Sequence, residues 1–196
     1  MARLFYVIGA SGAGKDTLLN FARARLNGTG NVLFAHRYIT RAAGLGNENH
    51  VSLSKEEFDF RLALGLFCLH WESHDCSYGI GVEINAWLSG GADVVVNGSR
   101  QYLAGALSKY PELIPVIITA SDEVIASRLS QRGRENDGEV QKRMARNDRL
   151  NTDFGGYLLV ENNHTVEEAG NRLLEILCKP DFSPNALTQS ALKGYY

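Results

Sequence analysis

The residues from Gly9 to Thr17, GASGAGKDT, form a glycine-rich segment that ends in a lysine. Phosphate-binding loops read G-x-x-x-x-G-K-[ST], and Gly9, Gly14 and Lys15 fill the defining positions. Glycines let successive backbone N–H groups turn toward phosphate oxygens, and the lysine adds a positive charge for the β- and γ-phosphates. The segment therefore predicts a nucleotide site, and a glycine-rich turn with an incidental lysine is the alternative. The predicted site consists of Gly9, Ala10, Ser11, Gly12, Ala13, Gly14, Lys15, Asp16 and Thr17.

Asp16 stands where the loop pattern has a magnesium-binding hydroxyl, and Thr17 supplies a hydroxyl one residue later. A carboxylate repels phosphates unless a cation lies between them, so we interpret Asp16 as a Mg²⁺ ligand, direct or through water. The run DVVV ends at Asn97 and no carboxylate follows it, which leaves this duty to Asp16. The alternative is a solvated aspartate that the dipole at a helix N-terminus favours.

Arginines gather in two parts of the chain. Arg37 and Arg41 flank YIT in HRYITR. The second group consists of Arg128, Arg132, Arg134, Arg143, Arg146 and Arg149. We predict that Arg132 and Arg143 neutralise a transferring phosphoryl group, which needs charge more than covalent chemistry, and we interpret Arg128 and Arg149 as solvated.

The acceptor predicted from these patterns is itself a phosphate. No Ser-His-Asp arrangement and no catalytic carboxylate pair can be read from the sequence. A phosphate monoester has a second pKa near ~6 and is already anionic at neutral pH, so it needs no general base. The cluster HRYITR is therefore predicted to bind an acceptor phosphate.

The elements around these residues alternate between strands and helices. An apolar run from Leu4 to Ile8 predicts a buried strand, and Lys15 to Leu26 predicts the helix after the loop. Further strands are predicted at 32–38, 93–96, 113–119 and 157–160. Further helices are predicted from the capping boxes at 54–57, through Leu66, and at 165–168, and from Ser121 to the polar loop at 133–138. This order predicts an α/β fold with a mostly parallel sheet and ligands at the carboxyl ends of its strands.

Composition narrows the classes of function. The chain has 196 residues, of which 44% are hydrophobic and 21% charged, and this predicts one soluble domain. A net charge of −2 gives no support to nucleic-acid or acidic-membrane partners, and no apolar run is long enough to span a membrane. Three cysteines favour a reduced, cytoplasmic protein. The residues 180–196 are predicted to be a loosely packed tail.

Together these motifs resemble the guanylate-kinase branch of the P-loop nucleoside-monophosphate kinases, over nearly the whole chain up to Lys179. The segments that carry the resemblance are GASGAGKDT, HRYITR, ENHVSLSKEEF, Tyr78–Gly79, RLSQRGREN and VENNHTVEEA. The resemblance implies a three-layer fold with a parallel central sheet over residues 1–179. It also implies an inserted acceptor-binding subdomain at about 36–90 and a small lid at about 131–142.

HRYITR, GNENH, YGIGVEINAWL, VVVNGSR and RGREN are more closely similar to the ribose 1,5-bisphosphate phosphokinase family of phosphonate catabolism, whose loop also carries GKD. That resemblance implies transfer of the γ-phosphoryl group of ATP, with Mg²⁺, to the 1-phosphate of ribose 1,5-bisphosphate. The products would be 5-phosphoribosyl 1-diphosphate and ADP. By position the guanylate-kinase pattern implies Arg132 and Arg143 at the transferring group, where the loop motif also puts Lys15. It implies an asparagine, Asn162 or Asn163, near adenine. The predicted acceptor residues are Arg37, Tyr38, Arg41, Tyr78 and Asn97.

Three other interpretations stay open at this point. A guanylate kinase would need a base-reading glutamate where Leu69 and His70 stand, and its YGT motif has become Tyr78–Ile80. A guanylate-kinase-like peptide-binding scaffold usually has a degraded phosphate loop, whereas Lys15 is present here. A zinc site is the third alternative, with candidate ligands Cys68, His70, His74 and Cys76 in CLHWESHDC.

Overall fold

The computed structural model describes residues 1–28, 30–42, 48, 50–131 and 156–179. The described elements are β1 (Leu4–Gly9), α1 (Lys15–Leu26), β2 (Val32–Phe34), β3 (Arg37–Ile39), β4 (Val51–Ser52), α2 (Lys55–Ala63), β5 (Phe67–Ser73), β6 (Cys76–Gly81), α3 (Glu83–Ser89), β7 (Asp93–Asn97), α4 (Leu103–Lys109), β8 (Ile114–Thr119), α5 (Asp122–Gln131), β9 (Leu158–Glu161) and α7 (Val166–Cys178). None of the helices in these ranges is both long and apolar enough to cross a membrane.

The strands form two sheets. The five-stranded sheet has the order β2-β7-β1-β8-β9, and its β2–β7 and β8–β9 ladders are parallel. The four-stranded sheet has the order β4-β3-β6-β5, with β6 antiparallel to both of its neighbours. The predicted α/β class with a parallel central sheet is therefore confirmed. The chain divides into two compact units, Met1–Tyr6 with Arg23–Leu113 and Val7–Ala22 with Ile114–Tyr196.

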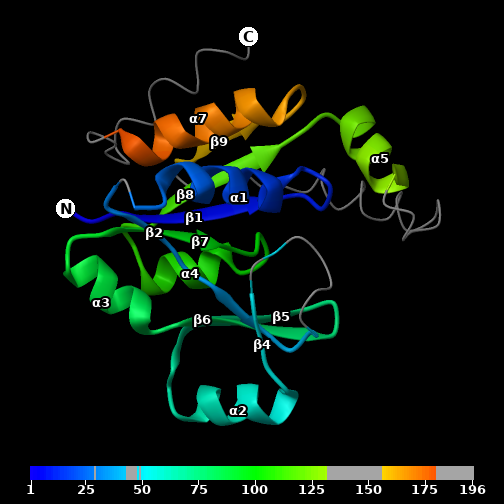
Figure 1. Cartoon of the computed structure of the whole chain (residues 1–196). Helices are drawn as coiled ribbons and strands as arrows, with labels where there is room; N and C mark the ends of the chain where they lie inside the picture. Colours follow the sequence, from blue (N-terminus) through cyan, green and yellow to red (C-terminus); the bar gives the residue numbers. More distant parts are fainter. Residues whose placement is uncertain (29, 43–47, 49, 132–155, 180–196) are drawn as a thin grey trace. The chain divides into compact units, whose positions relative to one another are not determined.

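The first unit contains the four-stranded sheet and the helix α2 that packs on it (Figure 1). Phe58 of α2 stacks on Phe67 of β5 with ring centroids 4.7 Å apart, and the Arg61 guanidinium lies over the Tyr38 ring. The predicted insertion at 36–90 falls inside this unit. As domain boundaries, the limits 1–179 and 36–90 stay predictions.

The second unit contains the glycine loop, β8, β9 and α7, which lies beside β9 in Figure 1. A complete capping box starts α7, because Thr165 accepts from the Glu168 N–H and the Glu168 carboxylate accepts from the Thr165 N–H. Gly170 lets α7 approach α1 closely, since a Cβ there would lie 2.4 Å from the Phe21 ring. The predicted lid, apart from Gln131, and the tail at 180–196 lie outside the described residues.

Two predicted elements differ from the structure. The single strand expected at 32–38 is two strands in different sheets, and the chain leaves the first after Phe34, where the Ala35 N–H still donates to Val95. The helix expected through Leu66 ends at Ala63, because Gly65 has φ +69° and the N–H groups of Gly65 and Leu66 turn back onto the carbonyls of Leu62 and Arg61.

At the start of that helix only half of the predicted capping box forms. Ser54 accepts from the Glu57 N–H, whereas the Glu57 carboxylate accepts from Arg61. The short elements β4, α3 and α4 and the β5–β6 hairpin were not among the predicted elements.

Candidate functional site

The glycine loop forms a turn between β1 and α1 that only small residues can make. Gly12 and Gly14 have φ values of +88° and +86°, in the region that side chains disfavour. The Ala13 N–H donates to the Ala10 carbonyl at 3.2 Å. A Cβ on Gly9 would lie 2.6 Å from the Ile118 carbonyl oxygen, so this glycine keeps β1 and β8 at their spacing. The loop thus has the backbone of a phosphate nest.

Asn162, just after β9, braces this loop. Its side chain is 1% exposed, its Nδ2 donates to the Ala13 carbonyl at 2.8 Å, and its own N–H donates to Thr119. A Cβ on Gly14 would lie 2.3 Å from that Nδ2, so the contact requires glycine. The neighbouring Asn163 instead accepts from the Ser121 N–H at 2.6 Å. A role for either asparagine near adenine stays a prediction.

Lys15 and Asp16 open α1 with opposite charges. Lys15 Nζ lies 3.3 Å from Asp16 Oδ1, and the side chains are 14% and 42% exposed. Magnesium binds proteins through one or two carboxylates together with substrate phosphates and water. The half-exposed Asp16 carboxylate, followed by the Thr17 hydroxyl in the first helical turn, fits such a partial ligand set.

Arg128 is a residue that the sequence interpretation missed. It was expected to be solvated, but its Nη1 is buried and has no hydrogen-bond partner among the described residues. This nitrogen lies 3.6 Å from where a Cβ on Gly14 would be, so a guanidinium stands against the glycine loop. The spacing of apolar residues on α5 does not predict the contact between Arg128 and the glycine loop, because that contact depends on how α5 packs against the loop in the folded chain.

In the first unit, four side chains converge from separate segments. Arg37 of β3 donates through Nε to one oxygen of the Glu48 carboxylate and through Nη2 to the other. Arg41 Nη2 lies 3.4 Å from Glu48, and Asn97 at the end of β7 donates to it at 3.2 Å. Arg37, Arg41 and Asn97 were predicted to bind the acceptor and are together here, whereas Glu48 was not predicted.

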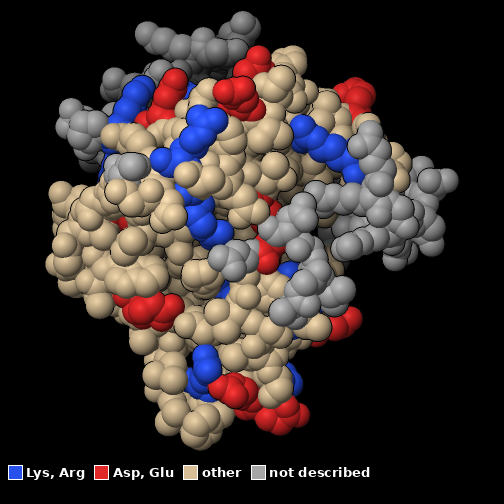
Figure 2. Space-filling model, viewed as in Figure 1, with Lys and Arg blue, Asp and Glu red and all other residues tan. Residues whose placement is uncertain are grey.

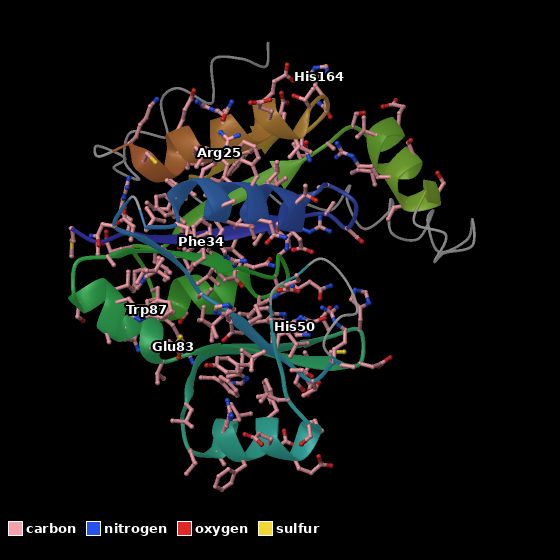
Figure 3. The ribbon with its side chains drawn as sticks, in the orientation of Figure 1. Arg25, Phe34, His50, Glu83, Trp87 and His164 are labelled. Carbon is pink, nitrogen blue, oxygen red and sulfur yellow. The ribbon has the colours of Figure 1, made fainter. Side chains whose placement is uncertain are left out.

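The backbone around this cluster is also fixed. One ring nitrogen of His50 lies 3.2 Å from the Glu48 carbonyl oxygen and the other 3.4 Å from the Arg41 carbonyl oxygen. Ser52 donates to the same Arg41 carbonyl at 2.7 Å. Figure 3 shows His50 beside β4, which starts at the next residue. The segment after β3 is thereby tied to β4.

A column of stacked rings lies under the cluster. The Arg37 guanidinium lies 5.1 Å from the Tyr78 ring centroid, Tyr78 stacks on Trp71, and Trp71 stacks on Tyr102. Burial raises the pKa of Tyr78, although the nearby Arg37 opposes this. Tyr78 was predicted beside the acceptor arginines, and the structure places it there. Tyr38 contacts Phe67 and Arg61 instead, so the structure does not bring it to this group.

The loop after β7 is held from below by Tyr6. Its hydroxyl accepts from the Ser99 N–H at 3.0 Å and donates to the Ser99 carbonyl at 3.2 Å. A Cβ on Gly98 would lie 2.3 Å from the Tyr6 ring, so only glycine fits above it. Burial raises the pKa of Tyr6 to about 12 and lowers the pKa of Arg100.

Other predicted site residues are outside this geometry. Arg132 and Arg143 lie beyond the described residues, and their roles stay predictions. The hairpin pairs Ser73 with Cys76, while Cys68 lies at the other end and donates to the Ile80 and Gly81 carbonyls. In the part of the chain that is described, no three His, Cys, Asp or Glu side chains are grouped to hold a metal, so the zinc alternative has no support.

Charge is distributed without a dominant sign. Figure 2 shows basic and acidic side chains interspersed over the visible face. This agrees with the net charge of −2.

The chain is similar to several proteins named ribose 1,5-bisphosphate phosphokinase PhnN. It is 49% identical to the one from Thiobacillus denitrificans, over 94% of this chain and 97% of that protein. It is 52% identical to the one from Chromobacterium violaceum, over 89% and 92% of the two chains. For the one from Desulfomicrobium baculatum the identity is 45%, over 93% and 98%. No protein-family model matches the chain.

Among solved structures, the fold is similar to guanylate kinase from Anaplasma phagocytophilum. The TM-score is 0.62 with 16% identity, over 90% of this chain and 84% of that chain. At this identity the likeness concerns the fold alone, and it confirms the predicted guanylate-kinase-like architecture.

Proposed function

The chain belongs to the ribose 1,5-bisphosphate phosphokinase family, and from this premise we propose that it phosphorylates the 1-phosphate of ribose 1,5-bisphosphate with ATP. An oxygen of that phosphate forms a bond to the γ-phosphorus, and the bond between the γ-phosphorus and the β,γ-bridging oxygen breaks. The products are 5-phospho-α-D-ribose 1-diphosphate and ADP. The reaction belongs to phosphonate catabolism, which is the setting that the family implies.

The donor half of this proposal is supported by the glycine loop. Its backbone and Lys15 bind the β- and γ-phosphates of ATP, and Asn162 keeps the loop in shape by holding the Ala13 carbonyl. Asp16 would hold Mg²⁺, which would supply charge neutralisation between phosphate oxygens, and the Thr17 hydroxyl would bond a phosphate oxygen. Arg128, which is half-buried and has a buried Nη1, adds positive charge beside the loop.

The acceptor half is carried by one observation, the pairing of Arg37 and Arg41 on a single carboxylate. A guanidinium that binds both oxygens of a carboxylate has the geometry that also binds a phosphate. Asn97 adds an uncharged donor to the same place. These residues bind the acceptor, and no general base is needed because the attacking phosphate oxygen is already charged.

The test is a reaction of the protein with ATP, Mg²⁺ and ribose 1,5-bisphosphate, followed by ³¹P NMR. New diphosphate resonances of the sugar product together with ADP are expected, and omission of Mg²⁺ should abolish them. A parallel reaction with GMP in place of the sugar tests the runner-up. Conversion of GMP to GDP with no turnover of the sugar bisphosphate would overturn the proposal.

Guanylate kinase activity is the second candidate, because the fold is shared. Leu69 and His70 stand where a base-reading glutamate is expected. Leu69 is 0% exposed and has no polar side-chain group, and the half-buried His70 has no carboxylate. A non-catalytic scaffold is the third, and calorimetry separates it, since a scaffold would not bind ATP. The intact loop and Lys15 favour an enzyme.

A further inference from the structure

The arginines assigned to the acceptor already hold an anion, and that anion belongs to the chain. Glu48 is 10% exposed as a side chain and Arg37 is 12% exposed, so the pair is largely removed from water. Both carboxylate oxygens are engaged by the Arg37 fork, and Arg41 and Asn97 approach the same carboxylate at 3.4 and 3.2 Å. Glu48 therefore uses the donors that a phosphate would use.

A carboxylate and a phosphate cannot share these donors. Like charges in direct contact raise each other's energy, and one guanidinium fork has two N–H groups to offer on that edge. The charge count of the cluster is two arginines against one glutamate. An entering phosphate therefore gains full access to the arginines only when the Glu48 side chain leaves.

The exchange can take place by rotation of the Glu48 side chain. This side chain has three rotatable bonds, so its carboxylate can leave the arginines while its backbone keeps its place. One ring nitrogen of His50 lies 3.2 Å from the Glu48 carbonyl oxygen, and the other lies 3.4 Å from the Arg41 carbonyl oxygen.

We propose that Glu48 competes with phosphate for Arg37 and Arg41, and that this competition weakens anion binding at the acceptor site so far that only a ligand with further contacts binds well. The inference rests on the proposed function only in assigning these arginines to the acceptor. Inorganic phosphate has a single anionic group and must displace Glu48 with that group alone. A bisphosphorylated sugar has a second phosphate and hydroxyl groups whose additional contacts offset the displacement.

The test measures inorganic phosphate binding by calorimetry with the glycine loop saturated by Mg²⁺ and a non-hydrolysable ATP analogue. Glu48→Gln keeps the size of the side chain and removes its charge, and it should bind phosphate roughly tenfold tighter than the unchanged protein. Glu57→Gln is the matched control, because Glu57 is an exposed carboxylate paired with Arg61 in the same unit, and it should have no effect. Arg37→Gln should abolish the gain in the Glu48→Gln background, which locates the phosphate at this cluster.

Equal or weaker phosphate binding by Glu48→Gln would overturn the inference, because Glu48 would then position the arginines rather than compete for them. If Glu48→Gln does not fold, Glu48→Asp replaces it. Its shorter carboxylate cannot reach both Arg37 donors in the same way, so tighter phosphate binding is again expected and weaker binding contradicts the inference.

The outcome is separable from that of the proposed function. Phosphate binding does not require turnover, so a protein that fails to use ribose 1,5-bisphosphate still answers this question. In an active enzyme, Glu48→Gln should also lower the inhibition constant of inorganic phosphate roughly tenfold. An inhibition constant that stays the same or rises would contradict the competition.

Discussion

Lys15 and Asp16 are adjacent residues of opposite charge, with Lys15 Nζ 3.3 Å from Asp16 Oδ1. At the scale of residues, the phosphate-binding loop and the membership of Lys15 and Asp16 in it could be predicted from the sequence, because the motif is contiguous. Glu48 and Arg128 could not be predicted, because their partners lie on other segments and only the fold brings them together.

The charge of Lys15 is expected to be essential for turnover. Lys15→Met should lower kcat by roughly 100-fold or more, since it removes a donor from the transferring phosphates while keeping the length of the side chain. The measurement is ADP release in a coupled assay. Lys55→Met is the control, because Lys55 is exposed on α2 and pairs only with Asp59 among the contacts described for it. Turnover within twofold of normal in Lys15→Met would contradict the role of the loop.

Asn162 and Asn163 form a natural pair of variants. Asn162→Ala leaves the Ala13 carbonyl without its donor and opens a gap against the loop, so we expect a loss of about 1–3 kcal/mol in the free energy of unfolding and a higher KM for ATP. Asn163→Ala removes only an exposed contact with the Ser121 N–H and should leave that KM unchanged. Thermal unfolding gives the stability of both variants, and ATP titration gives their KM for ATP. Equal KM values in the two variants would contradict the role of Asn162 in holding the loop.

At the scale of elements, the sequence predicts what periodicity and caps encode. The helix α7 starts at Thr165 as its capping box predicts, and the strands β1, β7 and β8 follow their apolar runs. Periodicity fails at 32–38, where apolar residues continue while the chain changes sheets. Periodicity also fails in the β5–β6 hairpin. The strand β5 has no regular alternation of buried and exposed residues, and its Trp71 stacks on Tyr78 of β6.

The turn of that hairpin can be improved. His74 and Asp75 have φ values of +50° and +57°, a conformation for which Asn-Gly is the preferred pair. The double substitution His74→Asn, Asp75→Gly should raise the free energy of unfolding by roughly 0.5–1 kcal/mol, because it relieves the backbone strain of two non-glycine residues. Urea denaturation measures this, and a decrease in stability would show that His74 or Asp75 makes a contact that matters more than the turn.

At the scale of the whole molecule, composition predicts a single domain and the order of elements predicts its α/β class, but neither predicts how stability responds to pH. Burial is the first cause that raises the pKa of Tyr6, Tyr78 and Cys68, and it raises the pKa of Tyr110 as well. Which acids are buried depends on the assembled fold. The sequence pI therefore says nothing about alkaline stability.

Alkaline conditions should destabilise the protein through these groups. The folded pKa of Tyr6 lies at about 12, above its usual value of 10.0, so between these pH values the unfolded chain loses the proton first. Stability is full below pH 10 and falls as pH rises toward 12, by on the order of 2–3 kcal/mol for this residue. Urea unfolding from pH 8 to 11.5 measures the slope.

Tyr6→Phe is the matching variant for that slope. It should be less stable at pH 8, because the Ser99 N–H loses its acceptor, but its stability should fall less steeply above pH 10. Identical slopes in the two proteins would show that Tyr6 does not set the alkaline limit.

The stack of Tyr78 on Trp71 has an optical consequence. The two ring planes are only 1° apart, and the guanidinium of Arg37 also lies over the Tyr78 ring, 5.1 Å from its centroid. The Trp71 indole is thus a fluorophore separated from Arg37 by the Tyr78 ring. According to the inference above, Arg37 exchanges Glu48 for phosphate when an anion binds. The chain has one other tryptophan, Trp87 on α3 (Figure 3), so Trp87→Phe would leave an emission spectrum that reports occupancy of the acceptor cluster without any added dye.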